Sequence, residues 1–154
     1  MNRSATVYLG EDRILMQPHD ISPYGEFEGE PVRTLSHAAS LEEVLSLLEQ
    51  SLADSRQIAE PPLNMRDPPK SLIAASGERT WSAISKAFAY VGVSEENDQL
   101  TFFSGFPEKG AFLFRTEAHW HCQKHDREQV RIAFRAAAST ACEAQNLSNP
   151  PPLG

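Results

Sequence analysis

Positions 90–103 of the chain read YVGVSEENDQLTFF. Residues that favour β-strands lie on both sides of the polar turn at 95–98, so the segment predicts two antiparallel strands joined by an acidic hairpin tip. Gly110 precedes another run of strand-forming residues at 111–116, and 118–122 is either its extension or its neighbour. We therefore expect three or four antiparallel strands in this half of the chain.

The amino-terminal segment predicts a second hairpin. Strand-forming residues at 6–9 and 13–16 lie on either side of a polar turn at 10–12. The stretch 17–31 then holds prolines, glycines and alternating glutamates. Because proline cannot donate to a strand ladder, we expect a long acidic loop here, with a short edge strand at 24–27 as an option.

The first helix has a strong start signal. Ser40 and Glu43 form the Ser-x-x-Glu pattern, in which each side chain bonds an otherwise unpaired amide group at the start of a helix. Apolar residues then recur at spacings of three and four, at Leu41, Val44, Leu45, Leu48 and Leu52. We expect this helix to run to about Ala59, where Pro61 and Pro62 prevent its continuation.

Two more helices are expected after a proline-rich surface loop at 61–69. Residues 80–88 predict a short helix with one apolar face, made of Trp81, Ile84 and Phe88. Asp126 is placed to cap a longer, alanine-rich helix. Its inward-facing residues are expected to be Val130, Phe134, Ala137 and Ala141.

The expected order of elements is strands, helix, helix, strands, helix, without strand–helix–strand alternation or an internal repeat. This order predicts an α+β fold, with an antiparallel sheet and helices packed on one face. A chain of 154 residues is the size of one domain. We expect a single α+β domain over 1–148 and a disordered, proline-rich tail over 149–154.

The composition limits the kinds of binding partner and the cellular compartment that we expect for this protein. Lys and Arg number 14 and Asp and Glu number 21, which gives a formal charge of −7. This charge disfavours direct binding to nucleic acid, because phosphates are repelled. No segment is apolar enough for a signal peptide or a membrane span, so we expect a cytoplasmic protein with Cys122 and Cys142 reduced.

The stretch 117–125, EAHWHCQKH, is the one that most suggests chemistry. On a strand, His119 and His121 project from the same side, and His125 could fold back to complete three nitrogen ligands for a divalent metal ion. The spacing matches neither a zinc finger nor a His-Glu-x-x-His site. We favour the interpretation that the histidines face water, and keep a small metal-binding protein or enzyme as the alternative function.

Motifs for other catalytic chemistry are missing from the sequence. It contains no Gly-x-Ser-x-Gly elbow for a serine nucleophile, and its glycines form neither a phosphate-binding loop nor a dinucleotide fingerprint. We therefore expect a protein that is not an enzyme and that uses no cofactor and no resident metal.

Two compact acidic groups are the best candidates for a binding surface. They consist of Glu26, Glu28 and Glu30 in the first loop, and of Glu95, Glu96 and Asp98 at the hairpin tip. If the fold brings them to one side, they form a carboxylate-rich surface suited to a basic protein, whose approach it would accelerate. Ordinary solvated turns explain the same residues equally well.

In its small size, acidic balance and carboxyl-terminal layout, the chain resembles the immunity proteins of bacterial contact-dependent growth inhibition and related polymorphic toxin systems. The layout consists of the helix at 81–87, the strands at 91–93, 100–103 and 110–112, and the helix at 126–144. The resemblance implies a cytoplasmic protein that binds a cognate toxin domain, in particular a nuclease, and covers its active site or substrate groove. A protein presenting carboxylates can occupy the positive groove of a basic nuclease. From the charge and the hydropathy of the chain we expect no direct contact with nucleic acid or membrane.

Overall fold

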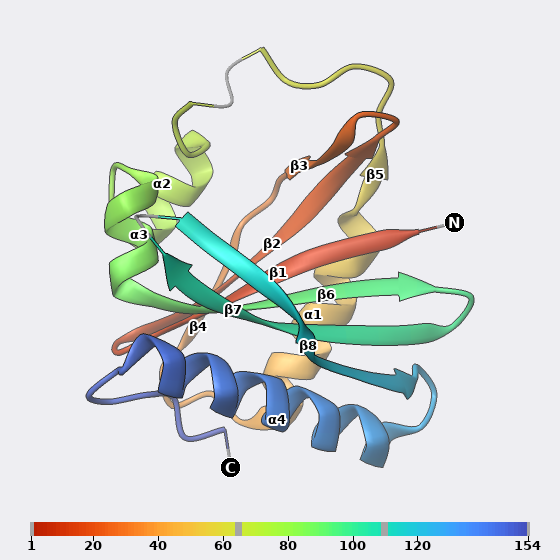
Figure 1. Cartoon of the computed structure of the whole chain (residues 1–154), viewed down its shortest axis with the longest axis vertical. Helices are drawn as coiled ribbons and strands as arrows, with labels where there is room; N and C mark the ends of the chain where they lie inside the picture. The colour runs from red at the N-terminus through yellow and green to blue at the C-terminus, as the bar shows by residue number, and fades with distance from the viewer. Residues whose placement is uncertain (1, 64–65, 109–110, 154) are drawn as a thin grey trace.

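The computed structural model describes residues 2–63, 66–108 and 111–153, with the backbone alone over 107–108 and 111–118 (Figure 1). Its strands are β1 (Arg3–Gly10), β2 (Arg13–Ser22), β3 (Gly25–Glu28), β4 (Arg33–Ser36), β5 (Arg56–Gln57), β6 (Phe88–Glu96), β7 (Gln99–Glu108) and β8 (Ala111–Gln123). Its helices are α1 (Leu41–Asp54), α2 (Lys70–Ser76), α3 (Trp81–Ala87) and α4 (Arg127–Gln145).

The strands form a sheet in the order β3-β2-β1-β6-β7-β8, and β4 and β5 also pair with β2. Both predicted hairpins are confirmed, as β1–β2 and as β6–β7. β1 lies inside the sheet, antiparallel to β2 on one side and to β6 on the other. Two hairpins distant in sequence are therefore joined through β1.

β8 is one long strand, so 118–122 is the extension of the strand at 111–116. Its pairing with β7 changes register between two positions, because Phe103 lies opposite His119 whereas Gly105 lies opposite Phe114. An irregularity of this kind bends a strand, and β8 is visibly bent in Figure 1.

The two long helices pack on one face of the sheet and enclose the main core. Ser40 and Glu43 form the predicted capping box of α1, and Asp126 caps α4 by accepting a hydrogen bond from the Gln129 amide. The predicted inward-facing residues of both helices are all buried. Among the described residues, no helix is both long and apolar enough to cross a bilayer. The expected α+β fold with an antiparallel sheet is confirmed.

The other face of the sheet carries a smaller apolar cluster under two short helices. Tyr8, Leu15 and Phe88 of the sheet pack there against Leu72 of α2 and Ile84 of α3. Alternation along β1 puts Tyr8 on the side opposite Val7 and Leu9, which belong to the main core. α3 confirms the short helix predicted at 80–88 except for Phe88, which begins β6 instead. α2 was not predicted, and Pro69 stands at its start, where a missing N–H costs no helical hydrogen bond.

The prediction that 17–31 is a loop is wrong over most of its length. β2 continues to Ser22 and β3 pairs back onto it, so the optional edge strand is present. Pro18 lies where the outer partner of β2 changes, since Met16 pairs with β4 and His19 pairs with β3. A missing N–H donor is tolerated at such a break in the ladder.

α1 ends at Asp54, five residues before the predicted end near Ala59. Ser55 is extended and ties the helix end to the sheet. Its hydroxyl donates to the His19 carbonyl oxygen at 2.7 Å and accepts from the Ser4 amide at 3.1 Å. Contacts to β1 and β2, rather than the local sequence, therefore end this helix.

The carboxyl-terminal residues return to the main core. Leu153 is 8% exposed and belongs to the core cluster. The Asn149 carbonyl oxygen lies 2.9 Å from Nε2 of His37, and the Ser148 amide donates to the Glu11 carboxylate at 2.8 Å. The division of the chain into a domain over 1–148 and a tail over 149–154 stays a prediction.

Candidate functional site

The sheet topology brings the two acidic groups toward the same end of the molecule. Glu26 is next to the β2–β3 tip, and Glu28 and Glu30 follow it inward, along β3 and just past its end. Because β1 is antiparallel to both β2 and β6, the ends of β2 and β6 lie beside the start of β1. Figure 1 shows the β2–β3 and β6–β7 tips on either side of the amino terminus. Three strand spacings separate β3 from β6, or about 14 Å. We call this region the acidic end, made of Glu26, Glu28, Glu30, Glu95, Glu96 and Asp98.

The six carboxylates of the acidic end differ in accessibility. Five of them are exposed, namely Glu26, Glu28, Glu30, Glu96 and Asp98. Glu95 is only 8% exposed, and one of its oxygens lies 3.1 Å from Nζ of Lys124. Glu95 also borders a cavity of about 350 Å³ between α1, α4 and the β6–β7 tip. It is therefore held inside the structure rather than presented on the surface.

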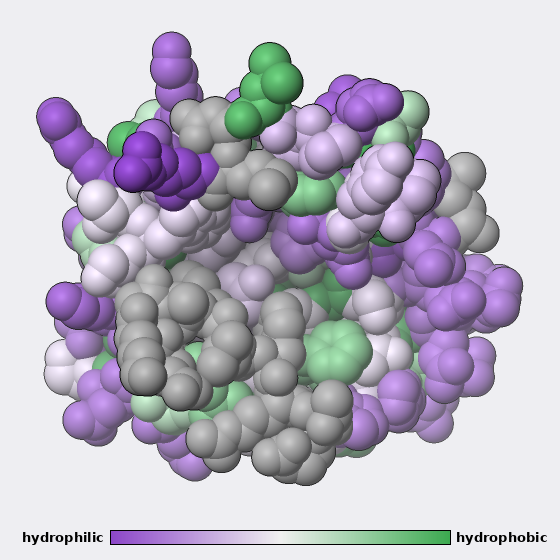
Figure 2. Space-filling model, turned by 45° about the horizontal axis from the view of Figure 1, so that its top comes forward, coloured by the Kyte–Doolittle hydropathy of each residue, from purple (hydrophilic) through white to green (hydrophobic). Residues whose placement is uncertain are grey.

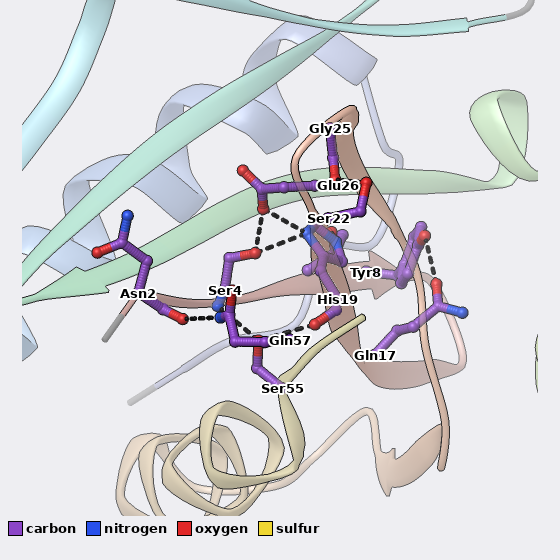
Figure 3. Close-up of polar contacts among 11 residues, drawn as sticks. Asn2, Ser4, Tyr8, Gln17, His19, Ser22, Gly25, Glu26, Ser55 and Gln57 are labelled. Carbon is purple, nitrogen blue, oxygen red and sulfur yellow. Dashed lines mark hydrogen bonds and ion pairs between the residues drawn. The ribbon is translucent and has the colours of Figure 1, made fainter. Parts of the chain in front are cut away.

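Glu26 belongs to a polar cluster on the sheet face opposite the main core (Figure 3). Its carboxylate accepts a hydrogen bond from the Ser4 hydroxyl and lies 3.2 Å from Nδ1 of His19. Nε2 of His19 is 2.6 Å from Oγ1 of Thr6. We call Ser4, Thr6, His19 and Glu26 the His19 cluster.

The His19 cluster continues into the sheet through Tyr90. A hydrogen bond joins Thr6 to Tyr90, and burial raises the pKa of the Tyr90 phenol to about 12 although this bond acts in the opposite direction. Burial also raises the pKa of Tyr8 well above its ordinary value, and the Tyr8 hydroxyl donates to Gln17 at 3.1 Å. Both phenols therefore stay protonated and act as hydrogen-bonding groups at neutral pH.

In the His19 cluster a carboxylate, an imidazole and a hydroxyl follow one another, as they do in the catalytic triad of a hydrolase. The low accessibility of the hydroxyls argues against that use here. Thr6 is fully buried and Ser4 is 4% exposed, so neither hydroxyl can reach a substrate without a rearrangement. Figure 2 shows a hollowed face of the molecule, with hydrophilic side chains gathered on one side of the hollow. The geometry supports positioning of β3 and its carboxylates rather than attack by a nucleophile.

The His19 cluster makes a pH-dependent contribution to stability that can be measured. The hydrogen bond from His19, followed by that from Ser4, lowers the pKa of Glu26 from 4.5 although partial burial acts in the opposite direction. A lowered folded-state pKa means that the contribution is complete above the unfolded-state pKa and is lost as pH falls through the folded-state value.

We expect Glu26→Gln to lower the free energy of unfolding by about 0.5 kcal/mol at neutral pH, a small value because half of the side chain is exposed. The difference in the free energy of unfolding between Glu26→Gln and the wild type should disappear below pH 4.5. Urea unfolding at a series of pH values checks this. Glu28→Gln, two positions along β3, is the matched control and should show no such convergence, and a pH-independent loss in Glu26→Gln would contradict the assignment.

The three histidines of the 117–125 stretch do not converge. His119 and His121 are exposed on one side of β8, while Cys122 is buried in the main core and Trp120 packs against it. His125 lies past the end of the strand, with Nε2 3.8 Å from the Asp98 carboxylate. Within the described residues, no group of three or more metal-binding side chains is present. The favoured interpretation, with these histidines facing water, is confirmed.

Sequence reasoning missed the His19 cluster. Its residues lie on β1, β2 and β3, up to 22 positions apart, and His19 was placed in a loop. One signal could have found part of it. Continuing the β1–β2 pairing outward from Leu9 and Ile14 brings Ser4 opposite His19, on the same face as Thr6.

Comparisons with known proteins support the fold. No family model and no curated protein matches the sequence. The fold is similar to that of a protein of unknown function, NMB0488, from Neisseria meningitidis, with a TM-score of 0.71 and 15% identity over 92% of this chain and 96% of that one. It is also similar to a chain of the CdiA-CT/CdiI toxin and immunity complex from Yersinia pseudotuberculosis, with a TM-score of 0.64 and 13% identity over 88% of this chain and 97% of that one. At these identities the likeness shows that this α+β fold also occurs in a toxin and immunity complex.

Proposed function

We propose that this chain is a cytoplasmic immunity protein that binds a cognate toxin domain and covers its active site or substrate groove. The observation that carries the proposal is the placement of both acidic groups at one end of the sheet. The likeness to a chain of a toxin and immunity complex, over 88% of this chain, supports the same function. In this function the chain binds a protein and catalyses no reaction.

The acidic end fits a basic partner. Apart from Glu26, which is exposed but bonded to Ser4 and His19, its exposed carboxylates are Glu28, Glu30, Glu96 and Asp98. Among the described residues, Asp98 has an ion-pair partner in Nε2 of His125 at 3.8 Å, and Glu30 lies close enough to Arg56 to interact electrostatically with it. The whole chain carries a formal charge of −7, so its long-range field also attracts a positive surface. A nuclease has such a surface because it binds a polyanion, and we propose a nuclease domain as the target.

Glu26 and Glu95 have a different role within this proposal. Glu26 is tied to Ser4 and His19, and Glu95 is tied to Lys124. Both carboxylates therefore hold the tips of β3 and β6 in place, and the other four members of the acidic end make the direct contacts. A rim charge that is free in the unbound protein steers association without first breaking an internal pair.

The test is a calorimetric titration of this chain with the basic toxin domain that a pull-down from its host's lysate identifies. We expect a combined variant of the acidic end to raise Kd about 100-fold at low salt, because four charge pairs worth about 0.7 kcal/mol each are lost. The difference should shrink at about 500 mM salt, where surface charges are screened. The variant carries Glu28→Gln, Glu30→Gln, Glu96→Gln and Asp98→Asn.

The matched control removes four acidic side chains outside the acidic end and should bind like the wild type. It carries Asp12→Asn, Glu78→Gln, Glu128→Gln and Glu143→Gln. An equal loss of affinity in the control would show that net charge, and not this surface, directs binding. No binding of the toxin domain by the wild-type chain would overturn the proposed function itself.

A further inference from the structure

The exposed pair His119 and His121 lies on β8, the edge strand that pairs with β7. Backbone pairing puts His121 opposite Thr101 and His119 opposite Phe103. On the other side of β8, Cys122 is 4% exposed within the main core. The backbone of the pair is therefore fixed by the ladder on one edge and by core packing beneath it, whereas both imidazole rings reach the surface.

The two rings are spaced as ligands of one metal ion would be. Their centroids are 4.8 Å apart and their planes meet at 70°. An imidazole nitrogen lies about 2.1 Å from zinc, which puts the ring centroid about 3.2 Å from the ion. Two rings at a tetrahedral angle then have centroids about 5 Å apart. The observed spacing needs no backbone movement to meet this value.

A neighbouring hydroxyl orients one of the two rings. Oγ1 of Thr101 lies 2.9 Å from Nδ1 of His121. In the tautomer in which Nδ1–H donates to the Thr101 hydroxyl, Nε2 is the coordinating nitrogen, which is the way in which protein metal sites fix their histidine ligands. Thr101 is thus a positioning residue for His121.

We propose that His119 and His121 form a two-histidine site for a divalent transition-metal ion, with Zn²⁺ as the probe. Imidazole ligands suit zinc, nickel and copper rather than magnesium or calcium. The remaining coordination positions face the open side of β8 and hold water in the isolated protein. His125 is not a ligand, since it lies past the strand end beside Asp98 and is 78% exposed. This site is separate from the acidic end and does not depend on the proposed immunity function.

The experiment is a calorimetric titration of the metal-free full chain with zinc chloride, repeated with nickel chloride. We expect one equivalent to bind, and His119→Gln or His121→Gln to weaken binding at least tenfold. Thr101→Val should weaken it less and should change the tautomer of His121, as seen in the ¹⁵N shifts of the imidazole. Amide spectra of each variant establish that it is folded.

Two other histidines serve as matched controls. His125→Gln and His37→Gln should bind zinc as the wild type does. Loss of binding in His125→Gln would overturn the two-histidine assignment in favour of a three-histidine site. Unchanged binding in both His119→Gln and His121→Gln, or no saturable binding by the wild type, would overturn the proposal as a whole.

Discussion

Replacing Phe134 with alanine is expected to lower the free energy of unfolding by about 3–5 kcal/mol. Phe134 is fully buried on α4, and its ring meets Phe102 of β7 edge-on, with centroids 5.8 Å apart. Loss of the ring leaves a cavity where α4 covers the sheet, because close-packed neighbours relax only partly. A loss of this size is a large fraction of the 5–15 kcal/mol by which domains are stable.

Urea unfolding followed by circular dichroism measures this effect. Ile132→Ala is the matched control, because Ile132 lies two positions earlier on α4 and is 60% exposed. Its loss should stay within about 0.5 kcal/mol. Comparable losses in the two variants would mean that α4 does not present Phe134 to the sheet.

Replacing Lys124 with methionine is expected to cost about 2–3 kcal/mol at neutral pH. Nζ of Lys124 lies 3.1 Å from one oxygen of Glu95, whose side chain is 10% exposed. The other oxygen of Glu95 is buried without a hydrogen-bond partner among the described residues. Methionine keeps the length of the side chain and removes the cation, so a buried carboxylate is left without a counter-charge.

The double variant Lys124→Met with Glu95→Leu tests the cause. It should recover most of the lost stability, because neither a buried charge nor an empty volume remains. His125→Gln, which alters the adjacent exposed residue, should change stability little. An unchanged stability in Lys124→Met would mean that Arg3, directly opposite Glu95 in the β1–β6 pair, takes over as its counter-charge.

Structural elements whose sequence signal lies within a few neighbouring residues were predicted correctly. The capping box at Ser40, the cap at Asp126 and both hairpins depend on contacts within a turn or a helix start, so the sequence contains all the partners. Hydrophobic periodicity likewise identified the buried stripes of α1 and α4. These elements and their order were sufficient for the α+β class with an antiparallel sheet.

Elements defined by distant partners were not predicted. β4 and β5 are too short for a sequence pattern, and they exist because β2 offers them an edge. α1 ends early because Ser55 bonds β1 and β2. Pro18 was read as a strand breaker, whereas it lies at a change of strand partner. In each case the deciding contact joins residues far apart in the sequence.

The sequence by itself determined which residues of this protein are charged, apolar or titratable, and where the capped helices and the two hairpins form. Only the tertiary structure decided how those residues are used. Antiparallel pairing of β1 with both β2 and β6 put the two acidic groups at one end of the sheet. Glu95 is buried beside Lys124, whereas its neighbours at the hairpin tip are exposed. β8 ends at Gln123, so His125 lies outside the strand that carries His119 and His121. The physical reason is that burial, charge pairing and convergence of ligands are properties of distances in space, which local sequence preferences do not fix.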